Sequence, residues 1–167
     1  MIVRPEGPRD SEAIRRVNIA AFAGHPLSRQ TEHLIVEELR AAGALDVSLV
    51  AELDGSVVGH IAFSRAQIGD EASGWYLLGP AAVLPDHQAR GIGRKLVETG
   101  LGAVRARGAG GCVLVGDPAF YARFGFAQIR GVTCAGVPDE NVLCLRFSGP
   151  MPSGEVLYHA AFSVDPG

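Results

Sequence analysis

Hydrophobic and polar positions along this chain follow two periods, and each period predicts a different kind of element. Apolar residues at helical spacing predict helices, and short apolar runs that end at Gly, Asp or Pro predict strands. The predicted helices begin at Asp10 or Ser11, run from Thr31 to Gly43 and from Gly91 to about Arg107, and include a short one at Ala119–Phe124. The predicted strands are Ile2–Arg4, Ser48–Leu53, Val57–Phe63, Trp75–Leu84, Cys112–Val115, Phe126–Ile129, Val142–Phe147 and Val156–Phe162.

The order of these elements predicts the fold class. The helix after Gly91 connects strand 75–84 with strand 112–115, and a helical crossover of this kind joins parallel strands. Other strands follow one another through short turns, such as Asp54-Gly55, and are expected to be antiparallel. We therefore expect an α/β protein of the α+β type, with one mixed, mostly antiparallel sheet, a splayed parallel pair and flanking helices. A splayed parallel pair would open a cleft for a ligand.

Composition narrows the class of protein. The chain has 167 residues, of which 47% are apolar and 20% charged, so we expect a single folded domain over residues 1–167. The net charge is −3, so the protein has no overall positive potential that would attract nucleic acid or an anionic membrane surface. No apolar run is long enough to cross a bilayer, and because the first residues already read as a strand we expect no signal peptide. These features favour a cytoplasmic protein.

The spacing of cysteine and histidine predicts neither disulfides nor a metal site. Cys112, Cys134 and Cys144 are odd in number and lie in apolar stretches, so we expect buried, reduced thiols. The five histidines show no ligand spacing with one another or with cysteine. We therefore expect no metal ion.

A loop between the long strand and the following helix is the main candidate for chemistry. Pro85 ends the strand, a polar segment follows, and Gly91 and Gly93 lie at the start of the helix. The first N–H groups of a helix lack partners within the helix and attract anions, and glycine lets a phosphate approach the backbone. The spacing fits neither a Walker loop nor a Rossmann fingerprint, since Leu96 stands where the Rossmann motif has its third glycine.

Two motifs together resemble one known family. The Q-x-x-G-x-G stretch from Gln88 to Gly93 is similar to the pyrophosphate loop Q/R-x-x-G-x-G/A of the GCN5-related N-acetyltransferases (GNAT). The F-Y-x-x-x-G-F stretch from Phe120 to Phe126 resembles a second signature of that family. Segments such as S-L-V-A-E, V-V-G-H-I, L-G-P-A-A-V-L-P and G-D-P-x-F-Y-x-R-F-G-F are similar to its YhbS-like branch. The resemblance covers nearly the whole chain and implies the GNAT fold.

The resemblance implies that acetyl-CoA is bound as a co-substrate. In this family the pantetheine arm lies along the strand before the loop, and the diphosphate lies on the amides of the loop. The side chains of Arg90, Arg94 and Lys95 either reach the phosphates or form a solvated basic helix end, and the sequence leaves both open. The implied binding residues are Ala81, Ala82, Val83, Gln88, Ala89, Arg90, Gly91, Ile92, Gly93 and Arg94.

The resemblance also implies direct transfer of an acetyl group to a primary amine. Tyr121 would act as the general acid that protonates the leaving thiolate, and a backbone N–H near Val83 would stabilise the oxyanion. Ordinary pKa values near 10 for tyrosine and 8.5 for a thiol make this proton transfer uphill by about 2 kcal/mol. Cys112 as a nucleophile is disfavoured, because no histidine adjoins it in the sequence.

The sequence identifies no general base for the amine. The long strand carries no acid or imidazole, so five candidates remain by elimination only: His25, His33, His60, Glu71 and Asp117. A proton relayed through water, or an acceptor amine of low pKa, is an equally open alternative.

Three functions stay open at this point. The protein acetylates a small-molecule amine, acetylates a protein or peptide amine, or binds acyl-CoA as a non-catalytic or regulatory module. The expected acceptor loops, at residues 23–30, 67–74 and 131–141, carry no recognisable signature. A homodimer is also left open.

Overall fold

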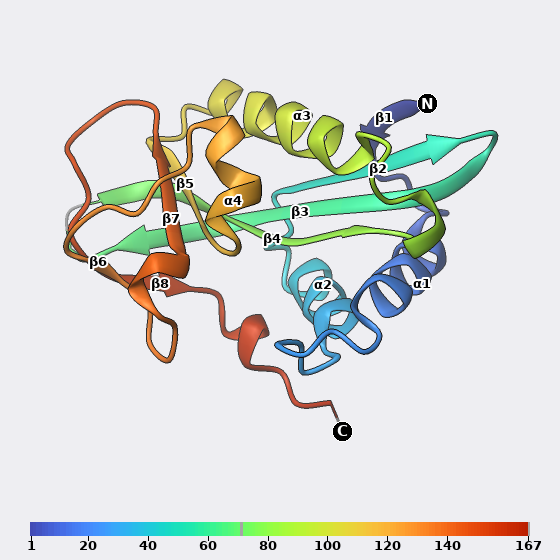
Figure 1. The fold of residues 1–167 in the computed structure, drawn as a ribbon, viewed down its shortest axis with the longest axis horizontal. Coiled ribbons are helices and arrows are strands. Elements are labelled where there is room, and N and C mark those ends of the chain that lie inside the picture. Colours follow the sequence, from blue (N-terminus) through green and yellow to red (C-terminus); the bar gives the residue numbers. More distant parts are fainter. Residues whose placement is uncertain (71, 167) are drawn as a thin grey trace.

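The fold is built around one long, twisted sheet with helices on both faces (Figure 1). The structure is a computed structural model and describes residues 1–70 and 72–166. The strands are β1 (Ile2–Pro5), β2 (Val47–Leu53), β3 (Ser56–Ile68), β4 (Ala72–Val83), β5 (Gly111–Val115), β6 (Val132–Thr133), β7 (Val142–Arg146) and β8 (Gly154–Tyr158). The α-helices are α1 (Ser11–Phe22), α2 (Glu32–Ala41), α3 (Ile92–Ala106) and α4 (Pro118–Tyr121).

The strands lie in the order β1-β2-β3-β4-β5-β7, and this path confirms the predicted mixed sheet. All neighbours on the path are antiparallel except β4 and β5. β4 and β5 are paired only over Trp75–Leu77 and Gly111–Val113, whereas β5 pairs with β7 along its whole length. On its β5 side, the edge of β4 from Leu78 to Val83 therefore has no paired strand among the described residues, as expected for a splayed pair.

Helices cover the two faces of the sheet separately (Figure 1). α3 packs on β2 and β3 on one face, where Leu96 and Val97 join the largest hydrophobic core. α1 packs on β3 and β4 on the other face, and α2 packs against α1. Ile14 and Val36 lie in the core on that side. The helical spacing of apolar residues in the sequence thus matches the buried faces of α1, α2 and α3.

The predicted strand at residues 126–129 is wrong. Only Ala127 pairs there, in a single bridge with Cys144, and Phe126 turns into the main core instead of continuing a strand. The strand of this region, β6, is two residues long and lies beside β8 in a second parallel pair. A strand so short leaves no periodicity in the sequence, which explains why it could not be predicted.

The predicted last strand, residues 156–162, is correct only at its start. β8 begins earlier and ends at Tyr158, and a 3₁₀ helix occupies Ala160–Ser163. The ring of His159 causes the change, because its Nδ1 accepts the N–H of Ala161 at 2.9 Å and so caps this helix. A capping side chain competes with a strand for the backbone N–H groups that follow it.

Two further differences concern the end of β3 and the cap of α1. β3 continues five residues beyond Phe63, because its end pairs with β8 as well as with β4. Asp10 does precede α1, but its carboxylate does not cap the helix. It instead accepts two hydrogen bonds from Arg4, at 2.7 and 3.1 Å, which ties β1 to the start of α1.

Candidate functional site

A cleft of about 480 Å³ opens where β4 and β5 diverge, beside the start of α3 and the short helix α4. Its walls come from the end of β4, the loop that follows, the first turns of α3, and the aromatic segment at α4. The lining residues are Ala81, Ala82, Val83, His87, Gln88, Ala89, Gly91, Ile92, Gly93, Arg94, Leu96, Val97, Phe120, Tyr121 and Arg123. No acidic side chain is among them, so the cleft favours an anionic ligand.

The start of α3 presents its backbone donors to this cleft. The backbone bond that begins the helix runs from the N–H of Lys95 to the carbonyl of Gly91, at 3.1 Å. The amides of Ile92, Gly93 and Arg94 precede it and have no carbonyl to bind within the helix. Together with the positive end of the helix dipole, they form a site for an anionic group such as a phosphate.

The backbone of the loop is bent to create this arrangement. Ala89 has a φ of 61° and Gly91 a φ of 81°, so two residues of the loop adopt the left-handed conformation. That conformation is strained for alanine, and such strain is found most often at functional sites. The side-chain amide of Gln88 donates to the carbonyl of Val83 at 3.1 Å and fixes the loop to the end of β4.

The glycine at the second helical position leaves room for a ligand. A Cβ added to Gly93 would meet Val83 at 3.8 Å and Phe120 at 4.0 Å, and nothing closer. The space it would occupy is therefore part of the cleft, not of the packed core. A phosphate group can approach the amides here without displacing protein atoms.

The free edge of β4 supplies a second set of backbone groups. From Leu78 to Val83 it faces the gap left by β5, and Ala81 to Val83 line the cleft. An extended ligand with amide groups can bind along such an edge as an additional strand does. The side chains of Ala81 and Ala82 pack in the cores on opposite faces of the sheet, so the edge itself consists of backbone groups.

Tyr121, the last residue of α4, lines the same cleft. Its ring lies on Gly116, where an added Cβ would come within 2.7 Å, and stacks edge-on against Phe120 at 4.9 Å between centroids. Burial, with a smaller contribution from Cys112, raises the pKa of Tyr121 to about 12. Among the described residues the hydroxyl has no hydrogen-bond partner, so it is a protonated donor available to a ligand.

The structure brings together almost all of the residues predicted to bind acetyl-CoA. All except Arg90 line the cleft, and so does Tyr121. Five lining residues were not among the predicted site residues: His87, Leu96, Val97, Phe120 and Arg123. Phe120 and Arg123 lie inside the F-Y-x-x-x-G-F motif, and His87 directly precedes the Q-x-x-G-x-G motif, so the sequence carried a signal for these positions. Leu96 and Val97 carry only the apolar pattern of a core helix.

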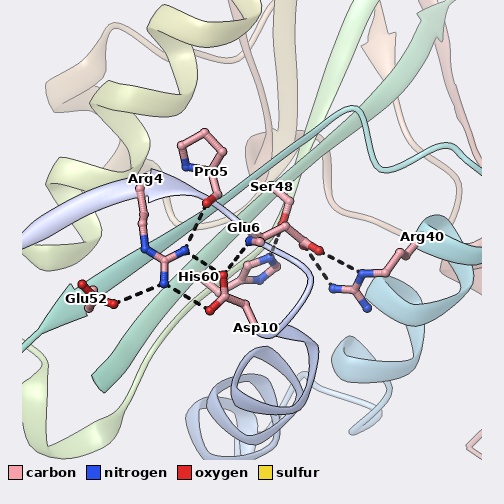
Figure 2. A network of polar contacts seen from close by, with 9 residues as sticks. Arg4, Pro5, Glu6, Asp10, Arg40, Ser48, Glu52 and His60 are labelled. Atoms are coloured by element: carbon pink, nitrogen blue, oxygen red, sulfur yellow. Dashed lines mark hydrogen bonds and ion pairs between the residues drawn. The ribbon is translucent and has the colours of Figure 1, made fainter. Parts of the chain in front are cut away.

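The predicted base candidate His60 lies in a different place, inside a polar network on the α1–α2 face (Figure 2). It is completely buried, and both ring nitrogens have partners. Nδ1 is 3.2 Å from the Asn18 amide nitrogen, and Nε2 is 2.9 Å from the Ser48 hydroxyl. Ser48 donates to Glu6, whose carboxylate also accepts from Arg40 at 3.0 Å. His60 is therefore part of the packed interior and cannot contact an acceptor.

The network also explains the ionisation of its members. Burial lowers the pKa of His60 to about 4, so the ring is neutral. Burial alone would raise the pKa of Glu6, but hydrogen bonds from Arg40 and Ser48 outweigh it and lower that pKa. An amide donor at Nδ1 and a hydroxyl acceptor at Nε2 fit a neutral ring protonated on Nε2.

None of the other described base candidates lines the cleft. His25 is exposed in the loop after α1, and His33 lies on α2. Asp117 caps α4, where its carboxylate accepts the N–H of Ala119 at 2.9 Å. Glu71 lies outside the described residues. Cys112 is fully buried, and burial raises its thiol pKa, which argues against a nucleophile.

Comparison with known proteins decides the family. Residues 45–128, half of the chain, match the model of the acetyltransferase (GNAT) domain. The chain belongs to the GNAT family. The predicted resemblance is thereby confirmed, and the pyrophosphate-loop motif and the F-Y-x-x-x-G-F motif lie within the matched residues.

Relatives of this GNAT protein support the predicted branch. It is 35% identical to the uncharacterized N-acetyltransferase YhbS of Escherichia coli K12 over 127 residues, which cover 75% of this chain and 73% of YhbS. A crystal structure of Escherichia coli YhbS in complex with CoA superimposes with a TM-score of 0.87 at 30% identity, covering 98% of this chain and 92% of that one. A GNAT acetyltransferase from Brucella melitensis in complex with acetyl-CoA has a TM-score of 0.85 and 50% identity, covering 96% and 97%.

Two further properties of this GNAT protein bear on the predictions. Within the described residues, no group of His, Cys, Asp or Glu is arranged to hold a metal ion. In the part of the chain that the structure describes, no helix is both long and apolar enough to cross a membrane.

Proposed function

We propose that this protein transfers an acetyl group from acetyl-CoA to a primary amine by direct attack, with Tyr121 as the general acid. One observation carries the proposal. The start of α3 with its unpartnered amides, the free edge of β4 and Tyr121 all line a single cleft, and no acidic side chain is among its described lining residues. These are the three features that a diphosphate, a pantetheine arm and a thioester sulfur require. A relative that is 50% identical was crystallised with acetyl-CoA, which supports the same ligand here.

In this proposal each wall of the cleft holds a different part of the coenzyme. The amides of Ile92, Gly93 and Arg94 bind the diphosphate, and the strained loop at Ala89 orients them. The edge of β4 at Ala81 binds the amides of the pantetheine arm. The reactive thioester then lies beside α4, and the binding energy of the distant groups is used to position it.

Tyr121 holds a proton at its hydroxyl oxygen and donates it toward the sulfur. With the pKa of the phenol at about 12, complete transfer to a thiolate of ordinary pKa would be uphill by about 5 kcal/mol. A leaving sulfur in the same buried cleft also has a raised pKa, which reduces this difference. We therefore expect Tyr121 to stabilise the departing charge as a hydrogen-bond donor before the proton moves.

The amine must lose a proton, and we propose that water carries it away. His60 is enclosed in the interior, and Asp117 is occupied as a helix cap. An acceptor that is already neutral at the working pH would serve equally well. A small-molecule amine and a peptide amine both satisfy this proposal.

A substitution at Tyr121 tests the proposed chemistry. Tyr121→Phe should retain the affinity for acetyl-CoA within about twofold and slow acetyl transfer at least tenfold, because a sulfur donor is lost but the cleft is kept. Thiol release across a library of amines measures transfer, and calorimetry measures binding. Tyr158→Phe, outside the cleft, is the matched control. Because the pKa of Tyr121 is raised, the wild-type rate should not decline through its ionisation below about pH 11.

Two outcomes would decide between this proposal and its alternatives. Unchanged turnover in Tyr121→Phe would remove the phenol from the mechanism. Saturable binding of acetyl-CoA without thiol release for any amine or peptide would favour the non-catalytic acyl-CoA-binding module.

A further inference from the structure

Arg123 is a cation in the cleft that the proposed chemistry does not use. Arg94, the other arginine of the lining, already binds Glu98 at 2.9 Å along α3. Within residues 1–70 and 72–166, no acidic side chain forms an ion pair with Arg123. A guanidinium that has no acidic partner and lies in a cleft without acids is available to an anionic group of a ligand.

The position of Arg123 is set by an aromatic cluster. Its guanidinium carbon lies 4.8 Å from the ring centroid of Phe120, a cation–π distance. The Phe120 ring is fixed in turn by edge-on contacts with Tyr121 at 4.9 Å and Phe124 at 5.5 Å. Phe120 also lies against Gly93, at 4.0 Å from the Cβ that this glycine lacks. The cluster therefore holds the guanidinium close to the amides of α3.

The chemistry of the coenzyme suggests what Arg123 binds. Coenzyme A carries two separate anionic groups, a diphosphate and a 3′-phosphomonoester on its ribose. The helix amides account for the diphosphate, whereas the planar fork of a guanidinium matches the several oxygens of a terminal phosphate. We propose that Arg123 binds the 3′-phosphate and thereby selects coenzyme A over its dephosphorylated form. This inference rests on the proposed function, because it requires the coenzyme to occupy this cleft.

Calorimetric titration with coenzyme A and with dephospho-coenzyme A tests the inference without any need for turnover. The wild-type protein should bind coenzyme A at least tenfold more tightly than the dephosphorylated form. Arg123→Ala should abolish this preference while binding dephospho-coenzyme A as the wild type does, within about twofold. Arg123→Lys should keep part of the preference, because it retains the charge but not the fork. Arg130→Ala, an exposed arginine outside the cleft, is the matched control.

The experiment shows which phosphate group of the coenzyme Arg123 binds. Equal weakening of both ligands in Arg123→Ala would place the guanidinium on the diphosphate and overturn the inference. A preference that survives in Arg123→Ala would overturn it as well. Failure of the wild-type protein to bind either ligand would contradict the proposed function itself, and thermal unfolding of each variant shows whether the fold is intact.

Discussion

Polar groups gather at two places in this protein, one on each face of the sheet, and they differ in whether the protein satisfies them. On the α1–α2 face, Glu6, Arg40, Ser48 and His60 bind one another in the interior (Figure 2). On the α3 face, the residues at the start of the helix and Tyr121 line an open cleft. Each of these four side chains has a partner within the protein, and among the described network atoms the Asn18 Oδ1 is left without one. The Tyr121 hydroxyl, by contrast, has no partner among the described residues.

This difference separates residues that stabilise the fold from residues that we propose bind a ligand. A buried histidine beside a serine and a carboxylate resembles a catalytic arrangement when only the residue types are considered. The geometry excludes it, because His60 is fully enclosed and both its nitrogens are occupied. Backbone amides and one phenol look ordinary in the sequence, yet they lack partners where a ligand can reach them.

The largest expected effect concerns the network, which should control stability as the pH falls. The pKa of His60 is lowered to about 4 in the folded protein, against 6.5 in an unfolded chain. The unfolded state therefore takes up a proton first, so this stability is present above pH 6.5 and is lost below it. We expect the free energy of unfolding to fall by about 2 kcal/mol between pH 7 and pH 5 through this group alone.

Chemical denaturation at several pH values measures this effect. In His60→Gln the loss between pH 7 and pH 5 should largely disappear, although the variant is less stable at pH 7. His33→Gln, which alters a histidine outside the network, should keep the wild-type pH dependence. A slope that persists in His60→Gln would mean that other groups cause it. Acetyl-CoA affinity at pH 7 should be the same in both variants, which separates the network from the cleft.

A smaller effect is expected from the strained loop of the cleft. Ala89 has a φ of 61°, and the left-handed conformation costs a residue with a Cβ about 1 kcal/mol or more. Ala89→Gly removes this strain and should raise the free energy of unfolding by about 0.5 kcal/mol, after the greater freedom of glycine in the unfolded chain is deducted. Ala103→Gly, within α3, should lower it by up to about 1 kcal/mol. Equal destabilisation of the two variants would show that the loop is unstrained.

The sequence predicted the cleft better than the network for a physical reason. The loop from Gln88 to Arg94 is continuous in the sequence, so its glycines and the helix start are visible together. Tyr121 was added by family resemblance, since nothing in its local pattern distinguishes it from a core aromatic. Arg123 lies within the second motif, but only the fold shows that it lines the cleft together with the start of α3.

The network could not have been predicted in the same way. Its members come from the segment after β1 and from α1, α2, β2 and β3. They are far apart in the sequence, so no local motif contains them. His60 appears in the sequence as a polar residue within an apolar strand, which fits a catalytic base and a satisfied core residue equally well. The failure at residues 126–129 has a similar origin, because long-range packing of Phe126 overrides a local strand pattern.

The most direct test of the account is a calorimetric titration of acetyl-CoA into wild-type protein, Gly93→Val and Gly102→Val. Both glycines lie in α3, but a side chain at residue 93 would enter the cleft between Val83 and Phe120, whereas one at residue 102 meets nothing within 4 Å. Gly93→Val should bind at least a hundredfold more weakly, and Gly102→Val should bind as the wild type does. Wild-type affinity in Gly93→Val would contradict the claim that the start of α3 holds the coenzyme.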